Sequence, residues 1–392
     1  MKLRTISAWV LIFALSCVAH AFAQIRPQTL ADSKTPGSVI VFPKFINRAP
    51  VSVDGAVLPR TEIEIGVVCP TNTACTEHQP VKIRFHWVCP GAQLLDTLFV
   101  CPETDFDVVL SVNGKLAFSA DGTSMNSNSP RVPQPKCPNG YLIGWVIDTI
   151  DQPIKFDGLI GNAVLRGPAL IAGPNAGSSA AVTGYSATTI QADPALSTND
   201  PIATEIDPAT GTSSLAFDGA PAHYQAVTGV LYGHVKFDRM VPGGDPAPSN
   251  ALNETWLILL TLNVRSNLPN FPTFAPLEFY NESSVSLNGD PAFARLTSGS
   301  TEFLCWTQVQ LSDIHPDLNQ VSQGTRKGQV IAGPTIKVPF LGIFDTPGPV
   351  TLLGFVQLIE GAPANGFYER SYIHGMFNDG VPVSTRFLPF PF

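Results

Sequence analysis

The sequence predicts an all-β chain with an antiparallel β-sandwich architecture, and three observations support that class. Residues 81–88, VKIRFHWV, alternate large apolar with basic side chains, and several other segments show the same two-residue period. No segment of any length shows the 3.6-residue period of an amphipathic helix. The chain holds 36 proline and 32 glycine residues in 392, which favours turns over helices. We expect two packed sandwich-like halves with long loops rich in proline and glycine.

The chain begins with the features of a secretory signal peptide over residues 1–23. Two basic residues precede an apolar run from about residue 8 to 18, and Ala21-Phe22-Ala23 fits the small-x-small rule for cleavage before Gln24. The apolar run is too short to span a membrane as a helix. A lipoprotein signal that uses Cys17 is the alternative, which the residues before that cysteine match poorly.

The mature chain is expected to divide near residue 200, into an N-terminal β domain at 24–200 and a C-terminal β domain at 201–392. The stretch 158–201 is rich in glycine, alanine, serine and proline, and such small side chains bury little area. We therefore expect connecting structure there, with one short strand at about 185–191. Residues 207–221 continue the loop-like composition.

Period-two patterns place the strands in order along the chain. The expected strands of the first half are 37–45, 61–68, 81–88, 107–112 and 141–148. Asn113-Gly114 follows the fourth of them and predicts a hairpin turn. The expected strands of the second half are 231–238, 254–267, 277–287, 301–311, 328–338, 349–360 and 367–377.

The strand at 81–88 shows how we expect one face to be buried. Val81, Ile83, Phe85 and Trp87 face the core, where each large side chain contributes about 1.5–3 kcal/mol on burial. His86 falls on the opposite, polar face. We expect it to be an ordinary exposed histidine and not a catalytic one.

Six cysteines remain after the signal peptide is removed. In an exported chain an even number predicts disulfides, here three. Six cysteines allow 15 pairings, and the sequence cannot choose among them. Our expectation is Cys69–Cys75, Cys89–Cys101 and Cys137–Cys305. CxxC is absent and no cysteine lies at ligand spacing from a histidine, so a zinc site is not predicted.

Charge and motifs argue against several classes of function. The full chain has a net charge of −8, and loss of residues 1–23 removes two basic and no acidic side chains, which leaves −10. No basic stripe suggests nucleic acid as a partner. GxSxG, HExxH, GxGxxG and GxxxxGK[ST] are all missing. We predict no catalytic residue, no cofactor and no metal ligand.

Three weaker candidates remain after that search. Glu62 and Glu64 share a strand face and could be glycosidase carboxylates, but such pairs are common on surface strands. FDTPG at 344–348 resembles the turn of an aspartic protease in a single imperfect copy. Loop aspartates could hold calcium through scattered oxygens, although aspartate in loops ordinarily makes turns. They are Asp207, Asp218, Asp245, Asp290 and Asp379.

Several segments resemble a group of exported bacterial proteins that have no assigned activity. The segments are GSVIVFPKF (37–45), PIKFDGLIGNAVLR (153–166), ETWLILLTLNVRSN (254–267), FLCWTQVQLSDI (303–314), TRKGQV (325–330) and PVTLLGFVQLIEG (349–361). The resemblance spans most of the mature chain. It implies export and a bacterial source, and it brings no site residues with it.

The expected function is therefore a non-enzymatic exported protein. It is either a component of the cell surface or matrix, or a module that binds a protein or a polysaccharide, in the periplasm, at the cell surface or outside the cell. A hydrolase acting on polymers outside the cytoplasm is the alternative, with a site assembled from distant loops. An outer-membrane-associated β protein is a third interpretation. The terminal Phe392 favours it, whereas the prolines of FLPFPF argue against it. The ligand and the oligomeric state stay open.

Overall fold

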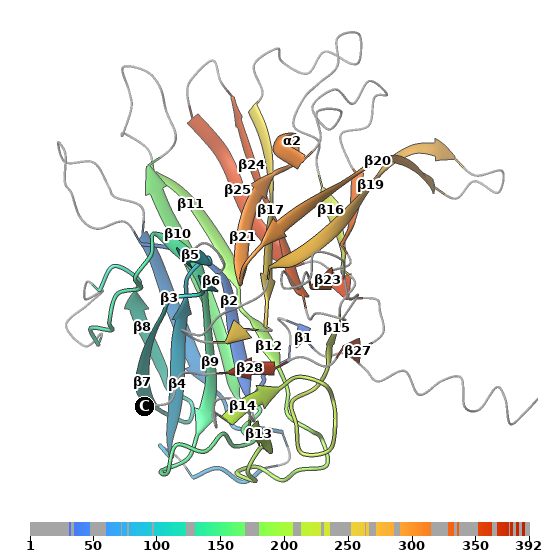
Figure 1. The fold of residues 1–392 in the computed structure, drawn as a ribbon. Helices are drawn as coiled ribbons and strands as arrows, with labels where there is room; N and C mark the ends of the chain where they lie inside the picture. The colour runs from blue at the N-terminus through green and yellow to red at the C-terminus, as the bar shows by residue number, and fades with distance from the viewer. Residues whose placement is uncertain are drawn as a thin grey trace, which may run out of the picture.

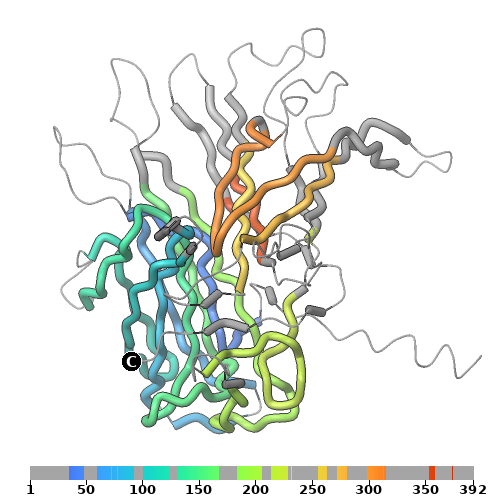
Figure 2. Tube along the Cα trace, in the orientation of Figure 1, coloured from blue at the N-terminus to red at the C-terminus, as the bar shows by residue number. Residues whose placement is uncertain are grey.

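A computed structural model gives the fold of the chain, which is all-β (Figure 1). The structure describes residues 31–32, 35–47, 60–71, 73–76, 78–95, 98–122, 130–168, 180–206, 213–228, 231–235, 252–262, 264–265, 272–285, 291–314, 328–332, 335–336, 352–362, 367–375, 377–378, 382–383 and 386–388. Figure 1 draws the other residues as a thin grey trace, and Figure 2 follows the chain in the same orientation. The prediction of an all-β, sandwich-like class is confirmed.

Two sheets of the first half form a sandwich. The first has the order β1 (Ala31–Asp32), β12 (Thr188–Ile190), β2 (Val39–Ile46), β9 (Asn139–Ile147), β4 (Pro80–Val88), β7 (Glu103–Ser111). The second has the order β11 (Ala180–Ser186), β10 (Leu159–Pro168), β3 (Arg60–Val67), β8 (Lys115–Ser119). Every pairing in these two sheets is antiparallel.

Aromatic side chains fill the space between these two sheets. Phe118 of β8 meets the rings of Phe85 and Trp87 of β4 edge-on, with centroids 6.1 Å apart in both pairs. Val81, Ile83, Phe85 and Trp87 are all buried, as the period-two pattern of this strand predicts. The face of β4 that carries these four side chains therefore packs in the core.

The second half supplies two further large sheets. One has the order β21 (Trp306–Gln310), β17 (Leu252–Thr261), β24 (Leu352–Ala362), β25 (Phe367–Gly375). The other has the order β20 (Pro291–Phe303), β19 (Thr273–Val285), β22 (Gly328–Ala332), β16 (Leu231–Val235), β26 (Phe377–Asn378), with β23 (Thr335–Ile336) also on β19. Strands β11, β25, β24, β17 and β21 run side by side across the upper part of Figure 1.

Short strands and a single helical turn complete the described part of the chain. The short strands form three small sheets: β13 (Thr204–Ile206), β14 (Ser213–Ala216), β28 (Arg386–Leu388) and β18 (Val264–Arg265); β15 (Val227–Thr228) with β27 (Pro382–Val383); and β5 (Ala92–Leu95) with β6 (Leu98–Val100). The helical turn is α2 (Leu311–Ile314). Among the described residues no helix is long and apolar enough to cross a membrane.

Strand β17 is buried on both faces and belongs to two cores. Ile258 and Leu260 join the large cluster that fills the N-terminal sandwich, whereas Leu257 and Leu259 join a second cluster with β16 and β19. Alternate side chains of a strand point to opposite faces, so one continuous apolar run can serve both. The sheet that contains β17 is thus a shared layer.

Specific contacts fasten the two halves to each other. Trp306 Nε1 donates to the carbonyl of Pro43 at 2.8 Å, and Lys44 Nζ donates to Gln357 Oε1 at 2.6 Å. The disulfide Cys101–Cys305 joins the halves covalently. The predicted domain boundary near residue 200 stays a prediction.

The stretch 158–201 is not the connecting structure that its composition suggested. It contains the ten-residue strand β10, which pairs with both β3 and β11. The small residues have a packing role: a Cβ on Gly161 would lie 2.6 Å from Cζ of Phe42 and 2.8 Å from Cδ1 of Ile40. Glycine at this position lets the side chains of Phe42 and Ile40 pack closely against the strand. The buried apolar area therefore comes from these two neighbours and not from the small residues of the strand. Likewise, β14 lies within the predicted loop at 207–221.

Asn113-Gly114 makes the predicted turn but not the predicted hairpin. Gly114 N–H donates to Ser111 O at 2.8 Å, and Asn113 has a φ of 60°. The strands on either side belong to different sheets, since β7 pairs with β4 and β8 pairs with β3. The turn therefore carries the chain from one layer of the sandwich to the other.

The six cysteines of the described residues all form disulfides, but only one of the three expected pairs is right. Cys69–Cys75 is confirmed, while the other two bridges are Cys89–Cys137 and Cys101–Cys305. The order of strands explains the difference. Cys89 follows β4 and Cys137 precedes β9, and β4 and β9 are neighbours in the sheet. Sequence distance along the chain does not reveal that adjacency.

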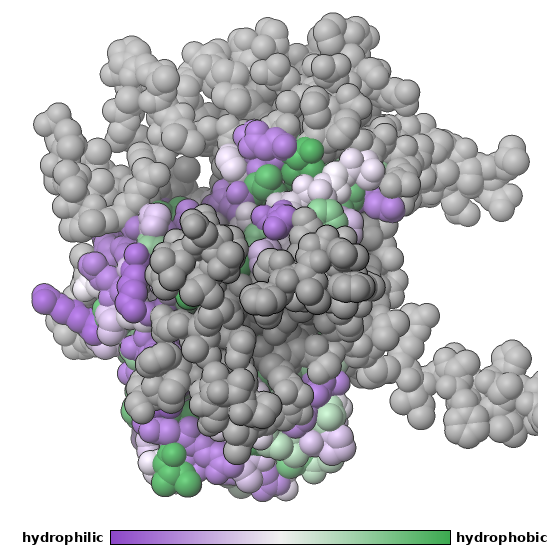
Figure 3. Space-filling view, viewed as in Figure 1, coloured by the Kyte–Doolittle hydropathy of each residue, from purple (hydrophilic) through white to green (hydrophobic). Residues whose placement is uncertain are grey.

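The described surface in Figure 3 is mostly hydrophilic, with small separate apolar areas. Among the described residues the exposed large hydrophobic side chains are Val109, Ile150 and Ile160.

Candidate functional site

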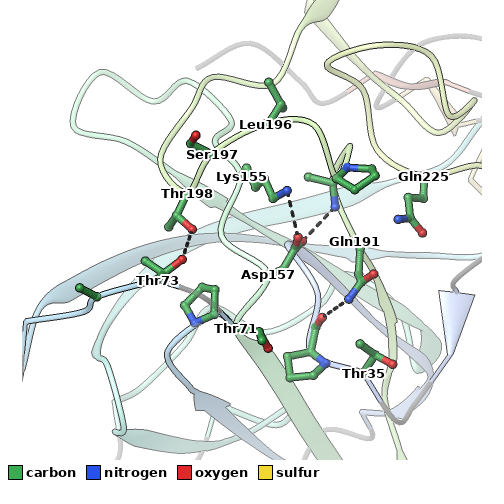
Figure 4. A pocket seen from close by; sticks show the side chains of 15 residues that line it. Thr35, Thr71, Thr73, Lys155, Asp157, Gln191, Leu196, Ser197, Thr198 and Gln225 are labelled. Carbon is green, nitrogen blue, oxygen red and sulfur yellow. Dashed lines mark hydrogen bonds and ion pairs between the residues drawn. The ribbon is translucent and has the colours of Figure 1, made fainter.

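A polar pocket of about 600 Å³ opens between loops at one end of the N-terminal sandwich (Figure 4). The loops precede β2 and β10 and follow β3 and β12. The lining residues are Thr35, Pro36, Pro70, Thr71, Thr73, Ala74, Lys155, Asp157, Gln191, Ala192, Pro194, Leu196, Ser197, Thr198 and Gln225. Hydroxyl and amide side chains make up much of this wall.

The disulfide loop CPTNTAC forms one side of the pocket. Cys69 and Cys75 close the loop, and the residues between them include four that line the pocket. Thr73 Oγ1 lies 2.7 Å from Thr198 Oγ1, which is a hydrogen bond between opposite walls. Gln191 Nε2 donates to Pro36 O at 3.2 Å on another side. The cross-link and these bonds hold the loops in a fixed arrangement.

Lys155 and Asp157 provide the charge of the pocket. Lys155 Nζ lies 3.8 Å from Asp157 Oδ2 and donates to the carbonyl of Asp193 at 2.8 Å. Asp157 Oδ1 accepts hydrogen bonds from Ser38 Oγ at 2.7 Å and from Ala192 N–H at 2.9 Å. Burial raises the pKa of Asp157, against the opposing effect of these donors and of Lys155. Among the described residues, the pocket therefore contains one cation, one carboxylate and many neutral hydrogen-bonding groups.

A second polar cluster lies in the interior, away from this pocket, and we call it the His86 cluster. It consists of His86 on β4 with Glu103 and Asp105 on β7. His86 Nδ1 lies 3.0 Å from Glu103 Oε2 and 2.7 Å from Asp105 Oδ1. The side chains of His86 and Glu103 are fully buried. The expectation of an exposed His86 is wrong, because the outer face of β4 is covered at this point.

The carboxylates decide the protonation of His86. Burial alone lowers the pKa of the imidazole, but the hydrogen bonds to Asp105 and Glu103 and the charges of both carboxylates raise it to about 9. The ring of Trp145 stacks on the imidazole at a centroid distance of 4.6 Å and an angle of 11°. The ring of His86 is thus held in position by contacts on its face and at its edge.

The His86 cluster is the inner end of a longer row of opposite charges, which we call the charge ladder. Lys82, Arg84 and His86 alternate along β4 and so share one strand face, where Arg84 and His86 are the cross-strand partners of Asp107 and Asp105 on β7. At the outer end, Arg84 Nε and Nη2 donate to the two carboxylate oxygens of Asp107 at 3.0 and 3.1 Å. Lys82 Nζ contacts Asp107 at 2.9 Å and Asp151 at 2.7 Å.

The weaker sequence candidates occupy structural roles or lie outside the described residues. Glu62 pairs with Arg60 and Arg166, and Glu64 pairs with Lys115, so each carboxylate has a cation beside it. Asp218 accepts a hydrogen bond from the backbone of Ala220 and lies 2.8 Å from His223 Nδ1. FDTPG at 344–348 and the other four loop aspartates lie outside the described residues.

Sequence reasoning missed both the pocket and the His86 cluster. The pocket residues at 191–198 fell in the supposed linker. The cluster had a readable signal in ETDFDVV, where acidic residues alternate along residues 103–107. An alternation of this kind predicts one acidic strand face, but the predicted strand began only at residue 107.

No protein-family model matches the chain, and a search among curated proteins finds no match.

Proposed function

We propose that the protein is an exported, non-enzymatic binding module whose pocket takes a polyhydroxylated ligand, a segment of a polysaccharide. The observation that carries this proposal is the pocket wall of hydroxyl, amide and paired charged side chains on cross-linked loops. Such groups donate and accept hydrogen bonds in many directions, which suits the hydroxyl groups of a sugar. A rigid scaffold with polar loops is a common arrangement for recognition sites.

Export is supported by the cysteines. Three disulfides are compatible with an oxidising environment such as the periplasm or the cell exterior. The basic start, apolar run and Ala-Phe-Ala of residues 1–23 add the expected route through the secretory pathway.

The test blocks the pocket without removing any of its hydrogen-bonding groups. Ala74 lines the pocket and is exposed, so Ala74→Trp places an indole in the opening without disturbing the core. The purified protein is screened against a panel of neutral, amino and acidic oligosaccharides, and affinity for the best binder is measured by calorimetry. We expect saccharide binding by the unaltered protein and a loss of at least about tenfold in Ala74→Trp, which corresponds to about 1.4 kcal/mol.

The matched control is Ala203→Trp, because Ala203 is also exposed but does not line the pocket. It should bind like the unaltered protein. If no saccharide of the panel binds at millimolar concentration, or if both tryptophan variants bind equally well, the pocket is not a saccharide site.

A hydrolase acting on polymers outside the cytoplasm is the second candidate, and Asp157 is the observation that favours it. A carboxyl group with a raised pKa at a pocket wall is a recurrent feature of catalytic acids. Incubation of the bound saccharide with the protein separates the two proposals. New reducing ends that disappear in Asp157→Asn would establish hydrolysis, whereas an intact saccharide would establish binding alone.

A further inference from the structure

The His86 cluster brings together the donor atoms of a metal site on two neighbouring strands. Glu103 and Asp105 are two residues apart on β7, so their side chains leave the same face of the strand. Asp105 is the cross-strand partner of His86 on β4. One nitrogen and two carboxylate oxygens, one from each residue, lie within 4.8 Å of one another.

The three side chains are held by regular structure and are not on loops. Trp145 of the adjacent strand β9 stacks on the imidazole ring and fixes its plane. Glu103 is fully buried, and Asp105 keeps 17% of its side chain exposed, which leaves a way in from solvent. Donor atoms that are positioned before binding lose little freedom when an ion arrives.

The charges of the cluster favour a divalent cation. A protonated imidazole balances one of the two carboxylates, whereas a divalent cation beside a neutral imidazole balances both. Buried charge is costly unless it is compensated, so the second arrangement suits a site from which water is largely removed.

We propose that His86 Nδ1 and the carboxylates of Glu103 and Asp105 bind a divalent transition-metal ion, with Zn²⁺ the best chemical match. Imidazole and carboxylate together are typical ligands of this ion. The ion takes the place of the hydrogen that Nδ1 shares with the two carboxylates, and it links β4 to β7 at the buried end of the charge ladder. The six cysteines of the described residues do not compete for it, because they are in disulfides. This site is separate from the saccharide pocket and does not depend on it.

The test uses the purified protein, stripped with EDTA and freed of the chelator. Zn²⁺ is titrated by calorimetry, and Co²⁺ is added in parallel as a spectroscopic probe. We expect one ion per chain, a rise in the thermal midpoint on binding, and visible Co²⁺ bands. Asp105→Asn keeps the shape of the side chain and an oxygen that can accept from the imidazole, but it loses the charge. We expect it to weaken Zn²⁺ binding at least about 100-fold and to lose the Co²⁺ bands.

The matched control is Asp107→Asn, which alters the next acidic residue on the same face of β7 but lies outside the cluster. It should bind Zn²⁺ as the unaltered protein does, and circular dichroism should show that both variants are folded. The proposal is wrong if the unaltered protein binds no stoichiometric Zn²⁺. It is also wrong if Asp105→Asn binds normally, or if Asp107→Asn loses as much affinity as Asp105→Asn.

Discussion

The two ends of the charge ladder both pair basic with acidic side chains, but their surroundings differ. At the outer end, the side chains of Lys82 and Asp151 are 33% and 48% exposed. At the inner end, those of His86 and Glu103 are fully buried. Exposed ion pairs contribute little to stability, while removal of one partner from a buried pair leaves an uncompensated charge. The position along β4, and not the residue type, should therefore decide what each pair contributes.

The largest loss of stability is expected when the disulfide that ties the inner end of the ladder to the second half of the chain is removed. The bridge Cys101–Cys305 begins two residues before Glu103 and spans 204 residues, whereas Cys69–Cys75 spans six. Loop-closure entropy predicts a loss of about 5 kcal/mol in the free energy of unfolding for Cys101→Ser with Cys305→Ser. The same estimate gives about 2 kcal/mol for Cys69→Ser with Cys75→Ser. Guanidinium denaturation of both double variants measures the two losses, and equal losses would contradict the prediction.

The next largest loss of stability is expected from a substitution within the inner end of the ladder. His86→Ala removes the imidazole and leaves Glu103 and Asp105 facing each other. Breaking a buried pair in this way costs about 3–5 kcal/mol. Unfolding in urea, with EDTA present so that no metal contributes, measures the loss. A change below about 1 kcal/mol would mean that the buried end is no more important than an exposed pair.

The apolar face of β4 offers a comparison on the other side of the same strand. A Cβ on Gly144 of β9 would lie 2.3 Å from Cε1 of the Phe85 ring. Gly144→Ala should therefore destabilise the protein by about 1–3 kcal/mol through overpacking. Gly184→Ala is the matched control in β11, because a Cβ there meets nothing within 4 Å. It should be neutral or slightly stabilising, since alanine restricts the unfolded chain. Thermal unfolding of the two variants should separate them, and equal midpoints would contradict the prediction.

The comparison also shows what the sequence could predict of the fold. The period of two identified β3 and β4, because successive side chains of a strand point to opposite faces. Nearly continuous apolar runs identified β2 and β9, which are buried almost throughout. Neither pattern identified β10, where Gly161 is needed for the approach of Phe42 and Ile40 from another sheet. When a residue must be small because a side chain distant in sequence packs against it, the surrounding sequence does not indicate the strand. The pairing of Cys89 with Cys137 depends in the same way on which strands lie side by side.

The site was harder to predict than the fold, for a physical reason. His86 has the alternation of an exposed residue, and only the packing of the complete molecule covers it. The pocket combines residues from several loops, such as Thr73 and Thr198, which are 125 residues apart in sequence. Burial and loop proximity are properties of the folded chain, and a local pattern does not contain them.

Lys44 is a second buried basic residue, and it can be compared with His86 at the buried end of the ladder. Its Nζ donates to the neutral Gln357, and burial lowers the pKa of Lys44 to about 7 from its ordinary value of 10.5. Between those values the unfolded chain holds a proton that the folded chain does not, so the folded state should gain stability as the pH rises. The gain is on the order of 1 kcal/mol for each pH unit. Lys44→Met should remove this rise when free energies of unfolding are compared from pH 7 to 10. Parallel curves for the two proteins would show that Lys44 keeps its ordinary pKa.

The smallest effect is expected at the outer end of the ladder, where Lys82→Ala removes the contacts with Asp107 and Asp151. We expect a loss below about 1 kcal/mol at low salt and a smaller loss in 1 M NaCl, because salt screens exposed charges. The hydrogen bond from Lys82 lowers the pKa of Asp151 below 3.8. The contribution should therefore be present above that pH and fade as the pH falls below it. Urea unfolding at pH 7 and pH 3, each at two salt concentrations, measures all four conditions. A salt-independent loss above about 2 kcal/mol would mean that solvent exposure does not distinguish the ends of the ladder. Position along β4 would then fail to explain the cost of removing His86.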